Sequence, residues 1–335
     1  MAVDADPRRV ALALSCRDTD VIPKVADAGA VRDGVQVMHN GVLVEEDGYQ
    51  GPWMTEIIRQ LRGHHEPQEE LAFHAVVERL AATSTAPAVV ELGSWWAYYS
   101  LWAMQRIPGA RSFCVEPDPA YLEQGRRNFA LNGREAVFHQ AAVGQLPLPP
   151  QPFLCESDGV ERQIAFEGLG SLLDRFGLQR ADLVLVDVQG AETSLLDGAR
   201  ALLSDGRVRF MVISTHHHVI SGDPLTHQRC LMLLRELGAH VIAEHTVAES
   251  FTGDGLIAVS FDPQDRDLEV ITSRCRVGES LFGDPLWDLA DAQAETVGVR
   301  TELEAARSCV DPARPPGGIY ARTKGKLSRL RPPPR

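Results

Sequence analysis

The sequence has little cysteine, no long apolar run and no excess of positive charge. Its six cysteines stand apart without a CxxC pair, in a chain too long to need disulfide staples, so we expect reduced thiols and a cytoplasmic protein. The N-terminus has no signal-peptide pattern and no window approaches about eighteen apolar residues, which predicts no membrane span. The formal charge of −13 argues against nucleic acid as a partner, because phosphate binding relies on clustered Lys and Arg.

Glycine is scarce at the first turn of the predicted sheet, where a dinucleotide-binding protein needs three. The stretch Glu91-Leu92-Gly93-Ser94-Trp95-Trp96 keeps one glycine and puts two tryptophans where a diphosphate would need room, so NAD does not suit this turn. An acid followed by one glycine suits a ligand with a carboxylate and a cation. S-adenosylmethionine is such a ligand, because its carboxylate can meet the amides of the turn while Glu91 favours its ammonium. A tight turn without a ligand is the alternative interpretation.

Strand-like and helix-like segments alternate from about residue 86 onward. Apolar runs predict seven strands, at 88–92, 112–116, 136–140, 182–187, 208–214, 240–245 and 256–261. Between the third and fourth strands, a proline-rich loop leads to two short strands near Leu154 and Ile164 and to a helix near 169–176. This alternation predicts an α/β fold with a doubly wound, seven-stranded, mainly parallel sheet whose last strand can enter antiparallel.

We expect this α/β domain to span residues 66–263. The segments before and after it have a weaker pattern of apolar residues. Residues 1–65 predict an N-terminal α+β extension with a strand over 10–14 and a helix over 53–61. Its segment 49–53, with 66–70 of the domain, is our candidate lid or acceptor-binding surface. Residues 264–335 predict a partly disordered C-terminal extension with a helix over 292–308. Its basic tail, which could bind an acidic surface or only aid solubility, has no acid after Asp311 and carries Arg314, Arg322, Lys324, Lys326, Arg329, Arg331 and Arg335.

The predicted strands end in polar residues, and parallel sheets bind ligands at that edge. Glu116 ends the second strand, where a carboxylate can accept both hydroxyls of a ribose. Capping of the next helix is the competing role, but Asp118 already serves it, with Pro119 at the first helical position. Gln140, at the end of the third strand, joins Glu116 among the expected cofactor contacts.

The fourth and fifth strands end in acids and histidines. Asp187, with Gln189 and Glu192 behind it, could orient the methionine part of the cofactor, hold a divalent metal or cap the following helix. Neighbouring strands would bring His216 or His218 near Asp187, as a general base for an acceptor hydroxyl or as a metal ligand. A solvent-exposed histidine cluster is the alternative. Zinc is disfavoured, because no cysteine has the spacing of a zinc site.

With these motifs in place, the chain resembles the FkbM-type family of S-adenosylmethionine-dependent methyltransferases, which are class I, Rossmann-like enzymes. The resemblance covers about residues 67–262 and departs from the family twice. Ala97 stands where the first turn usually has a further glycine, and Gln189 replaces the acid of the usual DVEGAE, which removes one carboxylate from a metal site. The resemblance rests on 90–94 with 98–101, on 115–119 with Asn128 and 131–132, and on 171–173 before 186–192.

The resemblance implies that Glu91, Gly93, Ser94 and Glu116 hold the cofactor, and that a hydroxyl of a sugar, glycoside or other natural product is methylated. To the cofactor contacts we add Gln140 and Asp187. We expect His216 to be the base or a polar ligand oriented by Asp187, with His218 as a further catalytic candidate. The sequence leaves open whether a divalent metal is required and whether the chain forms a homo-oligomer. Two rival functions also stay open: a non-enzymatic glycan- or protein-binding module on a degenerate nucleoside-binding fold, and a metal-dependent hydrolase.

Overall fold

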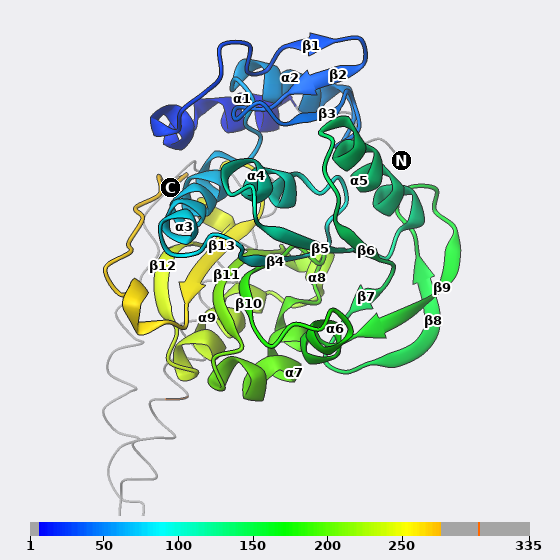
Figure 1. Cartoon of the computed structure of the whole chain (residues 1–335), viewed down its shortest axis with the longest axis vertical. Helices are drawn as coiled ribbons and strands as arrows, with labels where there is room; N and C mark the ends of the chain where they lie inside the picture. Colours follow the sequence, from blue (N-terminus) through cyan, green and yellow to red (C-terminus); the bar gives the residue numbers. More distant parts are fainter. Residues whose placement is uncertain (1–6, 276–300, 302–335) are drawn as a thin grey trace, which may run out of the picture. The chain divides into compact units, whose positions relative to one another are not determined.

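A seven-stranded sheet with helices on both faces forms the centre of the computed structural model (Figure 1). Its strand order is β12-β13-β11-β10-β4-β5-β6. Strands β4, β5, β6, β10 and β11 run parallel, and β13 lies antiparallel between β11 and β12. The predicted doubly wound, mainly parallel sheet is therefore confirmed. The strands are β4 (Ala88–Leu92), β5 (Arg111–Val115), β6 (Val137–His139), β10 (Ala181–Val186), β11 (Val208–Thr215), β12 (His240–His245) and β13 (Gly255–Ser260).

The structure describes residues 7–275 and residue 301. Residues 7–275 belong to one structural unit, Met1–Trp287. Apart from residue 301, the helix expected over 292–308 lies outside the described residues, and so does the basic tail. No helix in the described part is long and apolar enough to cross a membrane.

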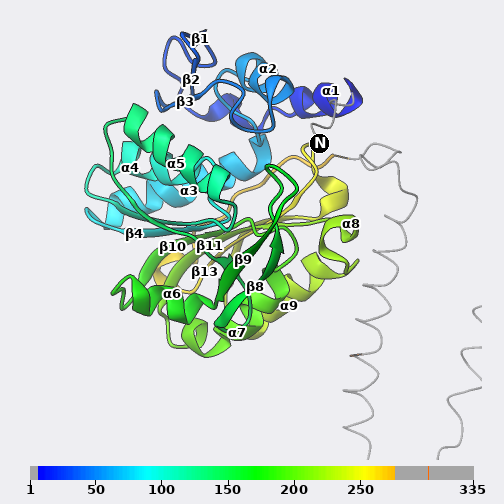
Figure 2. The same cartoon turned by 90° about the vertical axis from the view of Figure 1, so that its right-hand side faces the viewer.

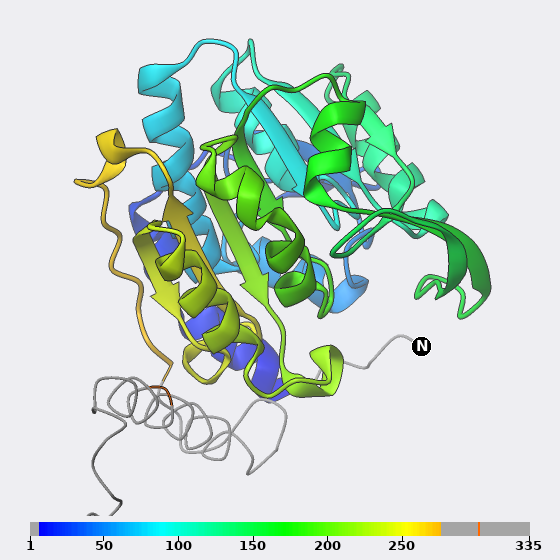
Figure 3. The same cartoon turned by 90° about the horizontal axis from the view of Figure 1, so that it is seen from below.

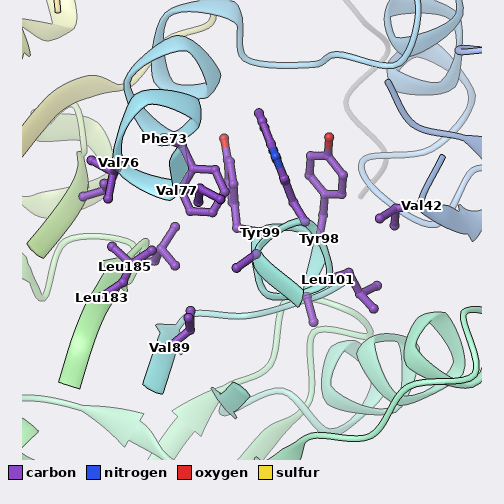
Figure 4. Close-up of a cluster of buried hydrophobic side chains, with 14 of the residues drawn as sticks. Val42, Phe73, Val76, Val77, Val89, Tyr98, Tyr99, Leu101, Leu183 and Leu185 are labelled. Atoms are coloured by element: carbon purple, nitrogen blue, oxygen red, sulfur yellow. The ribbon is translucent and has the colours of Figure 1, made fainter. Parts of the chain in front are cut away.

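Both faces of the sheet are covered, which explains why its central strands are continuous apolar runs. On one face Val89 and Leu183 pack against α3 (Pro67–Thr83), α4 (Tyr98–Arg106) and α5 (Pro119–Leu131). Their neighbours Val90 and Val184 pack on the other face against α6 (Leu169–Arg175), α7 (Glu192–Ser204) and α9 (Thr226–Glu236). Figure 2 shows the two helical layers, and Figure 4 shows the cluster around Tyr98 of α4 in the first layer.

The N-terminal segment packs on the α3–α5 face of the domain. It contains α1 (Pro7–Ser15), α2 (Pro52–Gln60) and an antiparallel sheet of β1 (Val31–Arg32), β2 (Val35–Val37) and β3 (Leu43–Glu45). The side chain of Asn132 donates to the carbonyl of Leu43 at 2.7 Å and accepts from its amide at 2.9 Å. Asn128 accepts from the amide of Glu45 at 2.9 Å. Two asparagines of α5 therefore satisfy backbone groups along β3.

Two local predictions were wrong. The strand expected over 10–14 is part of the helix α1, because a short apolar run does not distinguish the two. The proline-rich loop is largely a strand, β8 (Leu148–Leu154), which pairs with β9 (Glu161–Glu167) beside β7 (Ala142–Val143). Strand β8 lies at the edge of this small sheet, where prolines remove no ladder hydrogen bond. The resulting β8–β9 ribbon extends from the side of the domain (Figure 3, green).

Candidate active site

The turn after β4 approaches the end of β10 so closely that only glycine fits at its centre. Gly93 has φ +75°, and a Cβ placed on it would lie 1.6 Å from the carbonyl oxygen of Asp187. The amide of Asp187 donates to the carbonyl of Leu92 at 2.9 Å. The single glycine of the sequence motif thus brings the first turn and Asp187 together.

The backbone around this turn is strained in places. Trp95 has φ +34° and Ala97 has φ +57°, and Gln189 after β10 has φ +50°. Left-handed conformations of this kind cost non-glycine residues about 1–2 kcal/mol each and gather at functional sites. At Gly125 of α5, an added Cβ would lie 2.8 Å from the carbonyl oxygen of Trp95, so α5 packs directly against the turn. The left-handed φ of Ala97 gives a physical reason for a glycine at this position in the family pattern.

Glu91 is buried at the end of β4 and points toward the first turn of α4. Its Oε2 accepts the amide of Ser100 at 3.0 Å. Burial raises the pKa of the Glu91 carboxyl to about 7, and this effect outweighs the hydrogen bonds from Ser100. The carboxyl is therefore only half ionised near neutral pH, and a nearby cation would favour its charged form.

The amides of the turn are largely engaged within the protein. Those of Gly93 and Ser94 both donate to the carbonyl of Val115, at 2.9 and 3.0 Å, and that of Trp95 donates to Oε2 of Glu116 at 3.0 Å. The carboxylate of a ligand would therefore need other donors than these three amides. The hydroxyl of Ser94 is buried and has no hydrogen-bond partner, so it is available to such a ligand.

Glu116 lines a cavity of about 340 Å³ at the ends of β4, β5 and β10. Its second oxygen, Oε1, accepts the amide of Asp118 at 2.9 Å. Burial raises the pKa of Glu116 to about 8, against the lowering effect of these two amide bonds. The ring of Trp95 stacks on Tyr121 with centroids 3.9 Å apart, and both line the cavity. A cavity of this volume, with stacked aromatic rings and an acid, suits the nucleoside part of S-adenosylmethionine.

A smaller inner cavity of about 30 Å³ adjoins the nucleoside cavity. Gly93, Trp95 and Asp187 line both cavities, so they mark the junction between them. The inner cavity is rich in carboxylates and aromatic rings, which suit the positive charge of a cofactor of this kind. Its polar and aromatic lining consists of Tyr49, His65, Glu66, Glu69, Glu91, Ser94, Trp95, Trp96, Tyr99, Asp187 and Ser214.

His216 and Asp187 are in contact, as the order of the strands predicts. Nε2 of His216 lies 3.1 Å from Oδ1 of Asp187, and Nδ1 lies 2.6 Å from Oε1 of Glu192. Burial by itself would lower the pKa of His216, but the charge of Asp254 and the bonds to Asp187 and Glu192 raise it well above the usual value. Both ring nitrogens are thus occupied and the imidazolium is favoured. A histidine in this state is a poor proton acceptor but a firm support for Asp187.

Gln189 takes part in the same contacts. Its Nε2 donates to Oδ1 of Asp187 at 3.2 Å. The same nitrogen lies 2.9 Å from Nε2 of His216, but it forms no hydrogen bond with a protonated ring, because both nitrogens would then be donors. An amide in this place braces the Asp187 carboxylate without adding a negative charge. The substitution of the family's acid by Gln189 therefore leaves a hydrogen-bonded cluster rather than a further carboxylate ligand.

Two other expected site residues lie away from the cavities. Gln140 is exposed and donates to the carbonyl of Pro117 at 3.1 Å, which braces the loop after β5. His218 begins the short helix α8 (His218–Ser221), and its ring packs on His217 with centroids 4.0 Å apart. Neither residue lines the nucleoside cavity or the inner cavity.

The start of α3 supplies site residues whose individual roles sequence reasoning did not recognise. The carboxylate of Glu69 accepts the hydroxyl of Ser214 at 2.5 Å, and burial followed by the charge of Glu66 raises the pKa of Glu69 well above the usual value. His65 contacts Glu66 at 3.3 Å and Glu70 at 2.6 Å. Burial opposes the charge of His65, but these two acids raise its pKa to about 10. Acids after a proline are common at the start of any helix, so they do not by themselves indicate a site. The sequence therefore suggested only that residues 66–70 belong to an acceptor-binding surface.

Within residues 7–275, His39, His64 and Glu70 form the one grouping that could hold a metal, with ligand atoms within 4.8 Å of one another. All three are buried. The carboxylate of Glu70 already accepts the amide of His65 at 2.8 Å and bonds His64. This cluster is therefore accounted for as a buried support of the loop before α3.

Comparison with known proteins gives a family match for part of the chain. Residues 85–241 match the model of the methyltransferase FkbM domain, and no curated protein matches the chain. Among solved structures, precorrin-6y C5,15-methyltransferase from Geobacter metallireducens is 17% identical over 57% of this chain and 87% of its own, with a TM-score of 0.36. The METTL16 methyltransferase domain is 17% identical over 77% and 94%, with a TM-score of 0.38.

TrmK of M. capricolum, solved with S-adenosyl-homocysteine, is 10% identical over 75% of this chain and 93% of its own, with a TM-score of 0.35. At such scores the individual likenesses carry no argument about acceptors. The family match begins before the strand β4, ends within the strand β12 and contains all the residues that line the nucleoside cavity. The chain therefore contains, over residues 85–241, an S-adenosylmethionine-dependent methyltransferase domain of the FkbM type.

Proposed function

We propose that the chain transfers a methyl group from S-adenosylmethionine to a hydroxyl of a sugar, a glycoside or a related natural product. The observation that carries this proposal is the junction between the two cavities. Gly93, Trp95 and Asp187 line both, so a nucleoside in the larger cavity would direct the rest of the cofactor to Asp187. The inner cavity of about 30 Å³ has room for little more than one small group, so a hydroxyl of the acceptor, rather than the whole acceptor, would enter it and reach the methyl group beside a carboxylate.

The lining of the inner cavity supports an acceptor with several hydroxyls. Carboxylates such as Glu66 and Glu69 accept hydrogen bonds from hydroxyls. The ring of Tyr49 stacks on Trp96 with centroids 4.5 Å apart and an interplanar angle of 4°, which offers a flat apolar wall for one face of a sugar ring. Tyr49 comes from the N-terminal segment, so we assign residues 1–65 a role in acceptor binding, with residues 66–263 as the catalytic domain.

We assign the site residues as follows. The cofactor supplies the methyl group. Asp187 accepts the proton of the attacking hydroxyl, and His216 holds Asp187 in place as its positioning residue, which reverses the roles expected from the sequence. Glu116 binds the ribose, and Glu91, Gly93 and Ser94 surround the methionine part. Much of the rate acceleration then comes from holding hydroxyl and methyl at attack distance.

The test is methyl transfer from labelled S-adenosylmethionine to a panel of sugars, glycosides and phenols, with and without a chelator. We expect transfer to at least one hydroxyl, with no effect of the chelator. Asp187→Asn should lower the rate by about 100-fold or more, as removal of a general base does, while S-adenosylhomocysteine still binds. Asp197→Asn, an exposed acid on α7, is the matched control and should keep full activity.

Other results would contradict the proposal in distinct ways. Methylation of amines alone, with no hydroxyl modified, would show that the acceptor class is wrong. Tight cofactor binding with no transfer to any acceptor would favour the binding module. Turnover without a methyl donor, abolished by the chelator, would favour the hydrolase.

A further inference from the structure

The β8–β9 ribbon forms one wall of the nucleoside cavity, although it is separate from the main sheet. Phe153 and Leu154 of β8, Phe166 of β9 and Glu156 of the turn between them line this cavity. The other walls come from the turns after β4, β5 and β10, from Tyr121 of α5 and from Ala142 and Val143 of β7. Because the ribbon extends from the side of the domain (Figure 3), it is the wall with the least support.

The base of the ribbon is firmly attached to the domain. Strand β9 pairs with β7 through Phe166 and Glu167. The carboxylate of Glu167 accepts the hydroxyl of Ser171 at 2.6 Å and the guanidinium of Arg175 at 2.8 Å. Motion of the ribbon would therefore turn about this base and be largest at the opposite end, residues 155–160.

The turn of the ribbon is attached to the domain through one side chain. Oδ2 of Asp118 accepts the amide of Ser157 at 2.9 Å, and Oδ1 accepts the hydroxyl of Ser157 at 2.8 Å. Within residues 7–275, the two bonds between Ser157 and Asp118 are the ones that join residues 149–162 to the rest of the domain. The other hydrogen bonds of residues 149–162 run within the ribbon. Asp118 is only 2% exposed, whereas Ser157 is on the surface.

The same Asp118 also belongs to the cofactor site. Its Oδ1 accepts the amide of Ala120 and so caps α5, at 2.9 Å. Its own amide donates to Oε1 of Glu116, the acid assigned to the ribose, at 2.9 Å. A shift of Asp118 would thus change the position of Glu116 as well as the attachment of the ribbon.

We propose that Asp118 and Ser157 form a latch that holds the β8–β9 ribbon closed over the nucleoside cavity and sets how long the cofactor stays bound. Fresh cofactor enters and spent cofactor leaves when the latch opens and the ribbon turns about Glu167. The two residues are positioning residues, since they act through the ribbon and through Glu116. This inference rests on the assignment of the cavity to the cofactor and is independent of the acceptor.

The test measures release of S-adenosylhomocysteine by stopped-flow fluorescence, for which Trp95 in the cavity wall is the reporter. Ser157→Ala removes one hydrogen bond to a carboxylate, so we expect release about 5- to 10-fold faster. The KM for S-adenosylmethionine should rise by a similar factor without a fall in kcat. Ser157→Thr keeps the hydroxyl and should restore slow release. Arg162→Ala, which breaks the exposed pair with Asp158 in the same ribbon, is the control and should leave release unchanged.

A second measurement follows the ribbon directly. In hydrogen exchange, the amides of residues 153–157 should be slowed by S-adenosylhomocysteine in the parent protein and much less in Ser157→Ala. Unchanged release in Ser157→Ala, with unchanged exchange, would overturn the latch. Equal acceleration in Ser157→Ala and Arg162→Ala would also overturn it, because the effect would then reflect general loosening of the ribbon. A lower kcat with unchanged release would point to chemistry rather than retention.

Discussion

Replacement of Glu116 by glutamine tests the central electrostatic feature of the cofactor site. Burial raises the pKa of Glu116 to about 8 in the folded protein, whereas an ordinary glutamate titrates at about 4.3. Between these pH values the folded chain keeps a proton that the unfolded chain has released. The folded state then binds more protons than the unfolded state, so the cofactor-free protein loses stability as pH rises through this window.

The size of the effect follows from the linkage relation. One proton of difference changes the free energy of unfolding by about 1.4 kcal/mol per pH unit. From pH 5 to pH 8, Glu116 therefore lowers the free energy of unfolding of the parent by about 4 kcal/mol if its proton is fully retained. Glu116→Gln removes this proton while it keeps the shape of the side chain. The free energy of unfolding of the variant minus that of the parent should therefore increase steadily from pH 5 to pH 8, whatever the difference is at pH 5.

The assay is urea unfolding of both proteins without cofactor at pH 5, 6, 7 and 8. In parallel, the affinity for S-adenosylhomocysteine should rise with pH in the parent, because an ionised Glu116 accepts the ribose hydroxyls more strongly. In Glu116→Gln the affinity should be lower and less dependent on pH. Parallel stability curves for parent and variant would refute the reasoning, since they would show that Glu116 does not retain its proton on folding.

Three further substitutions test other parts of the structure. Gly93→Ala should destabilise by at least about 3 kcal/mol and abolish cofactor binding, because the new Cβ overlaps the carbonyl of Asp187; Gly133→Ala, with a left-handed φ of +58° and no neighbour within 4 Å, should cost only about 1 kcal/mol in urea unfolding. His216→Gln should lower the methyl-transfer rate but leave the shape of its pH profile unchanged, whereas loss of the acidic limb would show that His216 is the base. Arg209→Met should cost about 3–5 kcal/mol by thermal unfolding, because it leaves buried Asp265 without the guanidinium that contacts it at 2.8 and 2.9 Å; a neutral effect would show that the pair contributes nothing to stability.

Most elements of the sheet could be predicted from the sequence. Strand β4 begins and ends at the expected residues, because a central strand covered on both faces is largely apolar along its length. The edge strand β12 also has the expected ends, although only its middle residues form an apolar run. The cap at Asp118 and the proline after it could also be read locally, since capping depends on a few neighbouring residues. Prediction failed for α1 and β8, where a short apolar run and an edge position leave the local pattern ambiguous.

The site was only partly predictable. The rule that parallel strands bind ligands at their carboxyl ends pointed to Glu91, Glu116, Asp187 and His216, because strand ends can be recognised in the sequence. The first three line the two cavities, and His216 contacts Asp187. The same rule included Gln140, whose exposed side chain instead bonds the carbonyl of Pro117. A strand end determines where a residue lies but not where its side chain points.

What the sequence alone determined is the order of the sheet's elements, the single-glycine turn at Gly93 and the acids at the strand ends. Only the tertiary structure decided what these residues do together. His216 lies between Asp187 and Glu192, and the charge of Asp254 together with the bonds to these two acids favours its charged form. Glu69 lines the inner cavity beside Asp187, and Ser157 bonds Asp118, although each pair comes from distant segments of the chain. Such contacts depend on packing between distant segments, and no local pattern of residues records them.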